Sequence, residues 1–258
     1  MSRFLRLGCC VVAGAACSFA SAQISNVVYE ITATNSLGTS TFQATFDQGG
    51  FQGNGSWLWQ LPGPTTLMNE QGMAIATLNS GSTTLRPTFI GNFGYQIDLR
   101  FNLVAGSTPK GDPTVFTVKS ANMQIPAMQD PNARATITAS VWDLSGGGAT
   151  LYGDFPGPVV YWPRFNGEDP GQGTNWLPLL GEVSVDQPPP AFGQGNSAQP
   201  PVGMFAPIND LVTSMSQQLR FTLTPGDRAS ATAFFQAVPE PAAGLLIGLG
   251  LFGVLRRR

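Results

Sequence analysis

The sequence has 258 residues, a formal net charge of −2 and no histidine. The absence of histidine excludes Ser-His-Asp and Cys-His catalysis and every histidine-ligated metal site. All three cysteines lie within the first 17 residues, so the rest of the chain has neither disulfides nor thiolate ligands.

The N-terminal residues have the features of a secretory signal peptide. Two arginines precede an apolar stretch from Leu7 to Ala20, and Ala20-Ser21-Ala22 is a small-x-small cleavage site. We therefore expect a signal peptide over residues 1–22. A lipoprotein signal at Cys17 is the alternative, but the leucine that usually stands three residues before a lipidated cysteine is missing.

The body of the chain, residues 23–238, is long enough for one domain with a sizeable core. It contains eight basic and fourteen acidic residues, which gives it a net charge of −6. Only two of the basic residues are lysines, and the arginines are scattered, so there is no basic patch. Binding to nucleic acid is therefore not expected.

The hydrophobic periodicity of the body is that of β-strands. In the clearest case Tyr95, Ile97, Leu99, Phe101 and Leu103 alternate with polar residues. Trp57, Trp59 and Leu61 likewise share one face of a strand and are expected in the core. Further strands are expected over residues 27–34, 42–46, 73–78, 114–120, 135–142, 218–224 and 229–238. This pattern predicts an all-β fold, an antiparallel β-sandwich of jelly-roll or immunoglobulin-like type.

Two further segments complete the predicted domain. Asp186 to Pro207 contains six prolines and is expected to be a long surface loop. Pro207 to Met215 is expected to be a short helix, because its apolar residues fall at i, i+3, i+4 and i+7. The residues between this helix and the C-terminal tail are too few for a second domain, so residues 23–238 are expected to form one domain.

Four residues are candidates for binding carbohydrate. Tyr161, Trp162, Asn166 and Trp176 lie in a stretch rich in glycine and proline. An aromatic ring can stack on the apolar face of a sugar while amide side chains bind its hydroxyl groups. The alternative is that these rings anchor the core or a loop, as tryptophan and tyrosine usually do.

Glu168 and Asp169 are the only candidates for a metal site. Together with nearby asparagine and backbone oxygens they offer the hard ligands that calcium prefers, although the spacing matches no EF-hand. The alternative is a solvated acidic loop. Neighbours in sequence rarely flank a reacting centre from both sides, so we expect no catalytic residues and no enzyme activity.

The C-terminal residues combine a short apolar run with a basic end. Residues 242–255 contain no charge and are followed by Arg256, Arg257 and Arg258. As a helix the run would span roughly 21 Å, which is short for a bilayer core of about 30 Å. Arginines next to a span favour the cytoplasmic side, so the rest of the chain would lie outside. An ordinary C-terminal anchor is the plain interpretation.

Pro239, Glu240 and Pro241 precede this run, and the order of motif, span and basic end resembles the PEP-CTERM sorting signal of Gram-negative bacteria. The resemblance implies that an exosortase in the inner membrane processes the chain near Pro239-Glu240-Pro241 and passes it to the cell envelope or beyond. It implies a sorting role for Glu240 and for the three arginines.

The sequence thus favours an exported, non-catalytic protein of the cell surface or extracellular matrix, associated with exopolysaccharide. The alternative is a carbohydrate-binding module of β-sandwich type. The expected partners are an exosortase-type enzyme, the inner membrane in transit and an exopolysaccharide. No cofactor is expected, apart from the calcium that Glu168 and Asp169 could bind.

Overall fold

A computed structural model of the protein describes residues 23–88, 94–186 and 191–240. Within them nineteen strands form two antiparallel sheets, of ten and nine strands. Sheet 1 consists of β1 (Gln23–Ile24), β2 (Val27–Asn35), β3 (Gly38–Thr45), β9 (Thr114–Ser120), β10 (Met123–Gln129), β12 (Ala149–Gly153), β13 (Tyr161–Phe165), β14 (Thr174–Asn175), β15 (Glu182–Val185) and β18 (Leu211–Leu223). Sheet 2 consists of β4 (Gly50–Phe51), β5 (Trp57–Gln60), β6 (Thr65–Met68), β7 (Ala74–Thr88), β8 (Gly94–Ala105), β11 (Asn132–Asp143), β16 (Ala191–Gln199), β17 (Ala206–Pro207) and β19 (Arg228–Val238).

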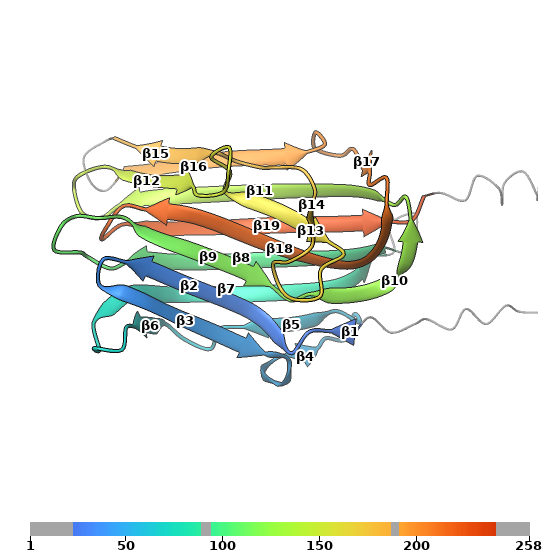
Figure 1. Ribbon diagram of the computed structural model, residues 1–258, viewed down its shortest axis with the longest axis horizontal. Coiled ribbons are helices and arrows are strands. Elements are labelled where there is room, and N and C mark those ends of the chain that lie inside the picture. Colours follow the sequence, from blue (N-terminus) through green and yellow to red (C-terminus); the bar gives the residue numbers. More distant parts are fainter. Residues whose placement is uncertain (1–22, 89–93, 187–190, 241–258) are drawn as a thin grey trace, which may run out of the picture.

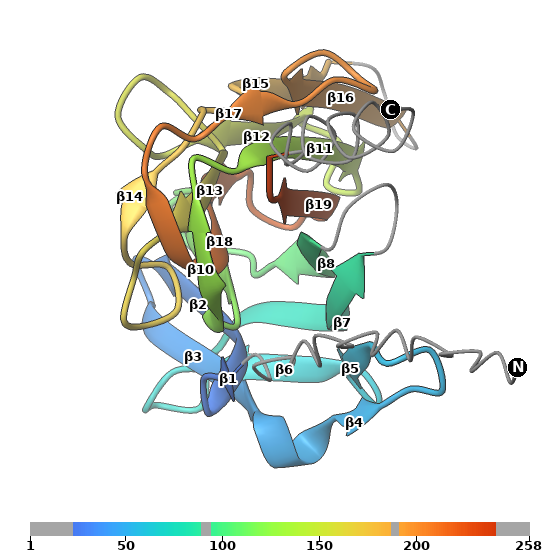
Figure 2. The same ribbon diagram turned by 90° about the vertical axis from the view of Figure 1, so that its right-hand side faces the viewer.

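The two sheets pack face to face, which confirms the predicted β-sandwich. Figure 2 looks along the strands and shows sheet 1 on the left and sheet 2 on the right. β2 packs against β7, and β18 packs against β8 and β19. With ten and nine strands the sandwich is larger than an immunoglobulin domain.

β18 is the central strand of sheet 1. It pairs with β9 and β10 along one flank and with β12 and β13 along the other. β2 then pairs with β9, and β3 pairs with β2 at the edge. In sheet 2 the order β16-β11-β19-β8-β7-β5 places β19 and β8 in the middle (Figure 1).

The core follows the predicted alternation. Ile97, Leu99, Phe101 and Leu103 are all buried, and the polar residues between them face outward. The predicted core positions Trp57, Trp59 and Leu61 are buried too.

Aromatic rings fill much of the space between the sheets. Phe221 on β18 stacks with Phe101 of the opposite sheet at 5.3 Å and with Phe116 beside it at 5.4 Å. Tyr29 contacts Trp59 across the sandwich, with their ring centroids 4.8 Å apart. These contacts bury apolar surface between sheet 1 and sheet 2, and this burial stabilises the packing of the two sheets in a body that has no disulfides.

One polar link crosses this core. The fully buried Gln217 of β18 donates from Nε2 to the carbonyl oxygen of Ile97 on β8, at 2.6 Å. Its Oε1 accepts from the hydroxyl of Tyr161, at 3.0 Å, and that hydroxyl also lies 3.2 Å from the carbonyl oxygen of Phe234 on β19. Every polar atom of the pair therefore has a partner, as a buried polar group requires.

The predicted helix over Pro207–Met215 is wrong. Ala206–Pro207 form β17 and Leu211–Leu223 form β18, and the only helical element among the described residues is a single 3₁₀ turn at Phe46–Gln48. The apolar spacing covered only two turns, whereas β18 forms ladders on both flanks along most of its length. Those ladders outweigh a short helical pattern in a segment of serine, threonine and valine with weak helix propensity.

The predicted loop over Asp186–Pro207 is wrong in its middle part. Ala191–Gln199 form β16, which pairs with β11 over nine residues. The alternation of apolar and polar side chains that predicts a strand is missing in this segment, because Gly193 and Gly195 have no side chains. A β-carbon on Gly193 would lie 2.6 Å from the carbonyl oxygen of Ser184, so β15 of sheet 1 contacts β16 of sheet 2 backbone to backbone.

The predicted signal peptide over residues 1–22 and the apolar run over residues 242–255 lie outside the described residues. Among the residues that the structure does describe, no helix is long and apolar enough to cross a membrane.

Candidate functional site

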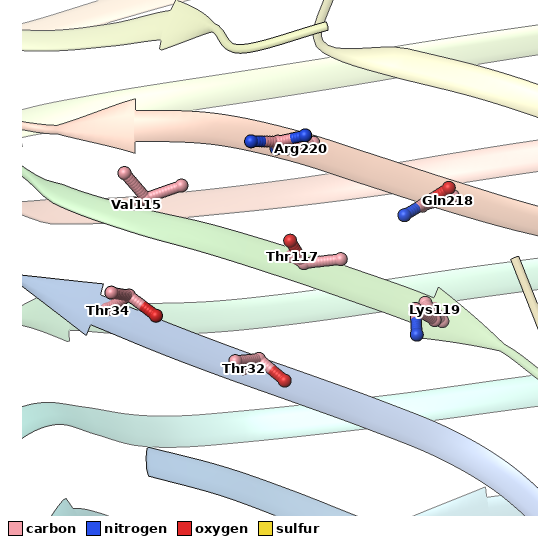
Figure 3. Close-up of a pocket in the computed structure, with 7 residues that line it drawn as sticks. All are labelled: Thr32, Thr34, Val115, Thr117, Lys119, Gln218 and Arg220. Carbon is pink, nitrogen blue, oxygen red and sulfur yellow. The ribbon is translucent and has the colours of Figure 1, made fainter. Parts of the chain in front are cut away.

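A shallow groove of about 420 Å³ lies on the outer face of sheet 1. Its lining residues come from three neighbouring strands and point away from the core (Figure 3). They are Thr32 and Thr34 of β2, Val115, Thr117 and Lys119 of β9, and Gln218 and Arg220 of β18. Six of these seven side chains are polar, so the groove suits a ligand that is recognised by hydrogen bonds.

Cross-strand register brings these residues together. Gln218 pairs with Lys119, and Lys119 pairs with Glu30 of β2. Two residues further along each strand, and so on the same face, Arg220 pairs with Thr117 and Thr117 pairs with Thr32. Because alternate residues of a strand share a face, these rows stand side by side on the solvent-facing surface.

Two ion pairs fix the cationic side chains. Lys119 Nζ lies 2.7 Å from Glu30 Oε1, and Arg220 Nε lies 2.7 Å from Asp154 Oδ2. Each cation still has further N–H donors, since an ammonium carries three and a guanidinium five. The ion pairs therefore position the two side chains at the groove without using all of their donors.

The pKa of Glu30 is lowered by this arrangement. Partial burial raises the pKa of the Glu30 carboxyl, but side-chain hydrogen bonds from Lys119 and Gln43 and the charge of Lys119 outweigh that effect. Gln43 Nε2 donates to Glu30 Oε2 at 2.7 Å. The carboxylate is thus held in its charged form beside Lys119.

Hydroxyl groups continue the polar surface toward the edge of sheet 1. Thr32 and Thr41 form a side-chain hydrogen bond of 3.0 Å, and Thr34 and Thr39 form another of 3.0 Å. These threonines face solvent on β2 and β3 and offer further donors and acceptors next to the groove.

The loop over residues 166–173 packs against two of the groove residues, Lys119 and Gln218. Gly171 has φ +72, and a β-carbon on it would lie 2.9 Å from Cδ of Lys119 and 3.3 Å from Cδ of Gln218. Only glycine fits a left-handed position this close to two side chains. Asn166 fixes the loop, because its Nδ2 donates to the Leu211 carbonyl at 2.6 Å and its Oδ1 accepts from Thr213 N at 2.8 Å.

The structure separates the four residues predicted to bind sugar. Tyr161 is wholly buried and its hydroxyl bonds inside the core, so assigning it to a sugar-binding surface was wrong. Trp176 is partly buried and packs on the core residue Phe235, with the ring centroids 5.8 Å apart. The amide of Asn166 is engaged in fixing the loop.

Trp162 is the one of the four that lies beside the groove. It pairs with Gln218, on the flank of β18 away from Lys119, and its ring meets Phe155 edge-on at 6.2 Å. Within the described residues neither its Nε1 nor Oε1 of Gln218 has a hydrogen-bond partner. Both atoms are buried from solvent, so the Trp162 ring adjoins the groove without presenting an open hydrogen-bonding atom to it.

Glu168 and Asp169 are exposed on the 166–173 loop. The Asp169 carbonyl accepts from Gln172 N at 3.1 Å, which closes a turn. Among the residues described by the structure, no three or more acidic side chains gather where a metal ion could bind. Calcium binding at Glu168 and Asp169 remains a prediction.

Sequence reasoning did not identify Lys119, Gln218 and Arg220 as one site. The sequence predicts strands over 114–120 and 218–224, which contain these residues, but it does not predict that the two strands pair. Which strands pair, and in which register, was the missing information.

The predicted sorting residues lie at the end of the described chain. Pro239 and Glu240 follow β19, and Glu240 is exposed, while Pro241 and Arg256–Arg258 lie outside the described residues. Comparison with protein families identifies this segment, because residues 237–258 match the PEP-CTERM protein-sorting motif. The C-terminal segment is a PEP-CTERM motif. It is an exosortase recognition signal and marks the chain as exported to the cell envelope or surface.

The PEP-CTERM match covers residues 237–258 and does not extend into the body of the chain. Among curated proteins, none matches the sequence. Two solved structures are similar in part: the K1 cleaved adhesin domain of Lys-gingipain from Porphyromonas gingivalis W83 (12% identity, 74% of this chain and 86% of that chain, TM-score 0.26) and infectious bursal disease virus Gt strain (12%, 86% and 80%, TM-score 0.12). At these TM-scores neither similarity carries an argument about fold or function.

Proposed function

We propose that this exported protein is a non-catalytic component of the cell surface or extracellular matrix that binds exopolysaccharide in the groove of sheet 1. The observation that carries the proposal is that Lys119 and Arg220 lie together on an open sheet face. Each is held in place by one ion pair and still has N–H groups with which to bind a ligand. A polymer can lie along such a face without entering an enclosed pocket. No lining residue of the groove is acidic, histidine or cysteine, and Glu30 and Asp154, which lie outside the lining, hold the two cations in ion pairs.

Charge supports a local role for these two cations. The body as a whole is acidic, with a net charge of −6, and would repel an anionic polymer. Lys119 and Arg220 supply donors at one place on that surface, and charge-assisted hydrogen bonds to carboxylate or hydroxyl oxygens are stronger than neutral ones.

A binding measurement tests the groove. The chain is titrated with exopolysaccharide purified from the native host, and Lys119→Gln/Arg220→Gln is expected to weaken binding about tenfold or more. Arg100→Gln/Lys110→Gln is the matched control, because it removes the same charge from exposed positions outside the groove. Equal affinities of the two double variants would contradict the proposal.

A carbohydrate-binding module is the second candidate, and Trp162 beside the groove is the observation that favours it. Such a module would bind isolated glycans through ring stacking. On a glycan array Trp162→Ala should then abolish a signal that Trp176→Ala retains. If both variants keep the signal, glycan binding through the Trp162 ring is excluded.

The tail has its own part in the proposal. The chain is exported through residues 1–22, is held in the inner membrane by residues 242–255, and is cut near Pro239-Glu240-Pro241 by an exosortase-type enzyme. The order of the matched motif, the apolar run and the three arginines supports this sequence of events. A proline disfavours helical backbone at the residue before it, so Pro241 favours an extended Glu240, as a protease requires.

Mass spectrometry of the protein from its native host tests the cut. Glu240→Ala should leave an uncut precursor in the membrane, whereas Glu182→Ala, an exposed acid on β15, should be processed normally. Arg256→Ala/Arg257→Ala/Arg258→Ala should instead impair retention of the tail. A wild-type protein that still ends at Arg258 would reduce the tail to an ordinary anchor.

A further inference from the structure

The loop between β16 and β17, residues 200–205, exposes a cluster of apolar side chains. Val202 is 87% exposed, Met204 59% and Phe205 38%. Single exposed apolar residues are normal, but three within four positions form a continuous patch.

The backbone of the loop holds this patch in a defined turn. Met204 N donates to the Pro201 carbonyl at 3.0 Å, and Gly203 has φ +87, so residues 201–204 form a tight turn with glycine at its third position. Val202 is thus at the tip of the turn, where solvent exposure ordinarily favours polar residues. Arg134 lies against the Phe205 ring, 5.0 Å from its centroid, and supports it from the sheet side.

The patch lies next to the point where the tail leaves the fold. Pro207 pairs with Asn132 of β11, and Asn132 pairs on its other flank with Val238, the last residue of β19. Two strand spacings therefore separate Pro207 from Val238, or roughly 10 Å. The apolar run that begins at residue 242 can start no more than about 14 Å from Val238.

We propose that the 200–205 loop docks on the bilayer surface while the tail is held in the membrane. This inference rests on the tail anchoring in the proposed function and adds a second, independent contact. A single anchor in the tail would not by itself set the orientation of the domain, whereas Val202 and Met204 in the interfacial region would fix it, as apolar side chains do for proteins that lie on membranes.

The docked orientation would expose the groove. Arg134 and Phe234, which the loop covers, belong to the outer face of sheet 2. The groove lies on the outer face of sheet 1, on the opposite side of the sandwich (Figure 2). A domain that rests on the loop therefore turns Lys119 and Arg220 away from the bilayer.

The attraction would be apolar, not electrostatic. Asp130 and Asp210 lie at the same end, joined by a hydrogen bond of 3.1 Å from Asp130 N to the Asp210 carbonyl. These carboxylates disfavour an anionic surface, so anionic lipid should not strengthen the docking.

The test places a fluorescent probe at the tip of the loop in the mature chain, residues 23–258, so that the apolar segment Leu7–Ala20 cannot itself bind the vesicles. This chain contains no cysteine, so Val202→Cys is the one position labelled with a nitrobenzoxadiazole dye. The chain is mixed with vesicles of phosphatidylcholine, or of phosphatidylethanolamine with phosphatidylglycerol. We expect a blue-shifted emission that nitroxide-labelled lipids quench in both kinds of vesicle. Lys110→Cys, in the loop before β9 at the far end of the sandwich, is the control and should stay water-like.

Two further variants separate the possible results. Met204→Ser/Phe205→Ser in the labelled chain should lose the blue shift but still sediment with the vesicles. Leu246→Asp/Leu251→Asp, in the tail, should reduce sedimentation. A chain that sediments while its Val202 probe remains in water overturns the docking and leaves the tail anchor intact. Sedimentation that is unchanged by the tail variant overturns the anchor itself, and with it the docking inference.

Discussion

Leu99 and Asp98 are neighbours in β8 but face opposite sides of sheet 2. Leu99 is 1% exposed in the core, while the Asp98 carboxylate accepts from Gln96 Nε2 at 3.0 Å and lies 3.3 Å from Arg86 Nη2. Leu99→Asp should lower the free energy of unfolding by about 4 kcal/mol or more, because it buries an unpaired charge. The Asp98 side chain is only 14% exposed, but Asp98→Asn keeps an oxygen that can accept from Gln96, so it should cost less, about 1 kcal/mol. Urea denaturation measures both, and equal losses would mean that the register of β8 is inverted.

Glu30 predicts a dependence of stability on pH. Its pKa in the folded protein is lower than in the unfolded chain, so its ion pair with Lys119 stabilises the fold above the unfolded value of about 4.3. That contribution is lost as the pH falls through the folded pKa.

The comparison of two variants isolates this carboxyl. The difference in unfolding free energy between wild type and Glu30→Gln should shrink as the pH is lowered from about 6 to 3. Glu182→Gln removes an exposed acid that makes no ion pair within the described chain, and serves as the control. A difference for Glu30→Gln that stays constant over this range would show that the ion pair does not contribute.

At the residue scale the sequence correctly predicted which side chains face the core, but it did not predict which residues come together in the candidate site. Alternation placed Leu99 and Trp59 in the core correctly, because period-2 burial is a local property of a strand. It could not show that Tyr161 turns inward to Gln217, since both lie in strands whose partners are distant in sequence. For the same reason the sequence pointed to Trp162 but not to Gln218, which pairs with it, or to Lys119, which pairs with Gln218 from the opposite flank of β18.

At the scale of elements, the errors occurred where pairing decides conformation. Residues 207–215 fit a helical pattern, but residues 211–215 pair with β10, and Met215 also pairs with β13. This pairing makes them the first part of β18. β16 was missed because Gly193 and Gly195 carry no side chains from which to read a period.

The close approach of β15 and β16 gives a prediction for Gly193. A β-carbon there would lie 2.6 Å from the Ser184 carbonyl, whereas one on Gly50 of β4 would meet nothing within 4 Å. Gly193→Val should therefore destabilise the protein by about 1–3 kcal/mol through overpacking, and Gly50→Val should be close to neutral. Thermal unfolding of the two variants measures this. Similar midpoints would mean that the edges of the two sheets do not touch.

For the whole molecule, two antiparallel sheets and a thiol-free body give one more prediction. The mature protein should show a β-rich circular dichroism spectrum, and its melting temperature should be the same with and without reducing agent, because residues 23–258 contain no cysteine. A spectrum dominated by helix would contradict the sandwich. A shift with reductant would mean that the cysteines of the first 17 residues are retained.

The two ends of the described chain lie at the same end of the sandwich (Figure 1). Gln23 pairs with Gln124 in the ladder that also holds Ser214, and Val238 closes β19 nearby. In the export route proposed above, the domain would be attached to the membrane at both ends, through residues 1–22 and through the tail. Because both attachment points leave from the same end, the ladders could form fully while both attachments remain. Under that proposal, release of the domain would require both cleavages, and they could occur in either order.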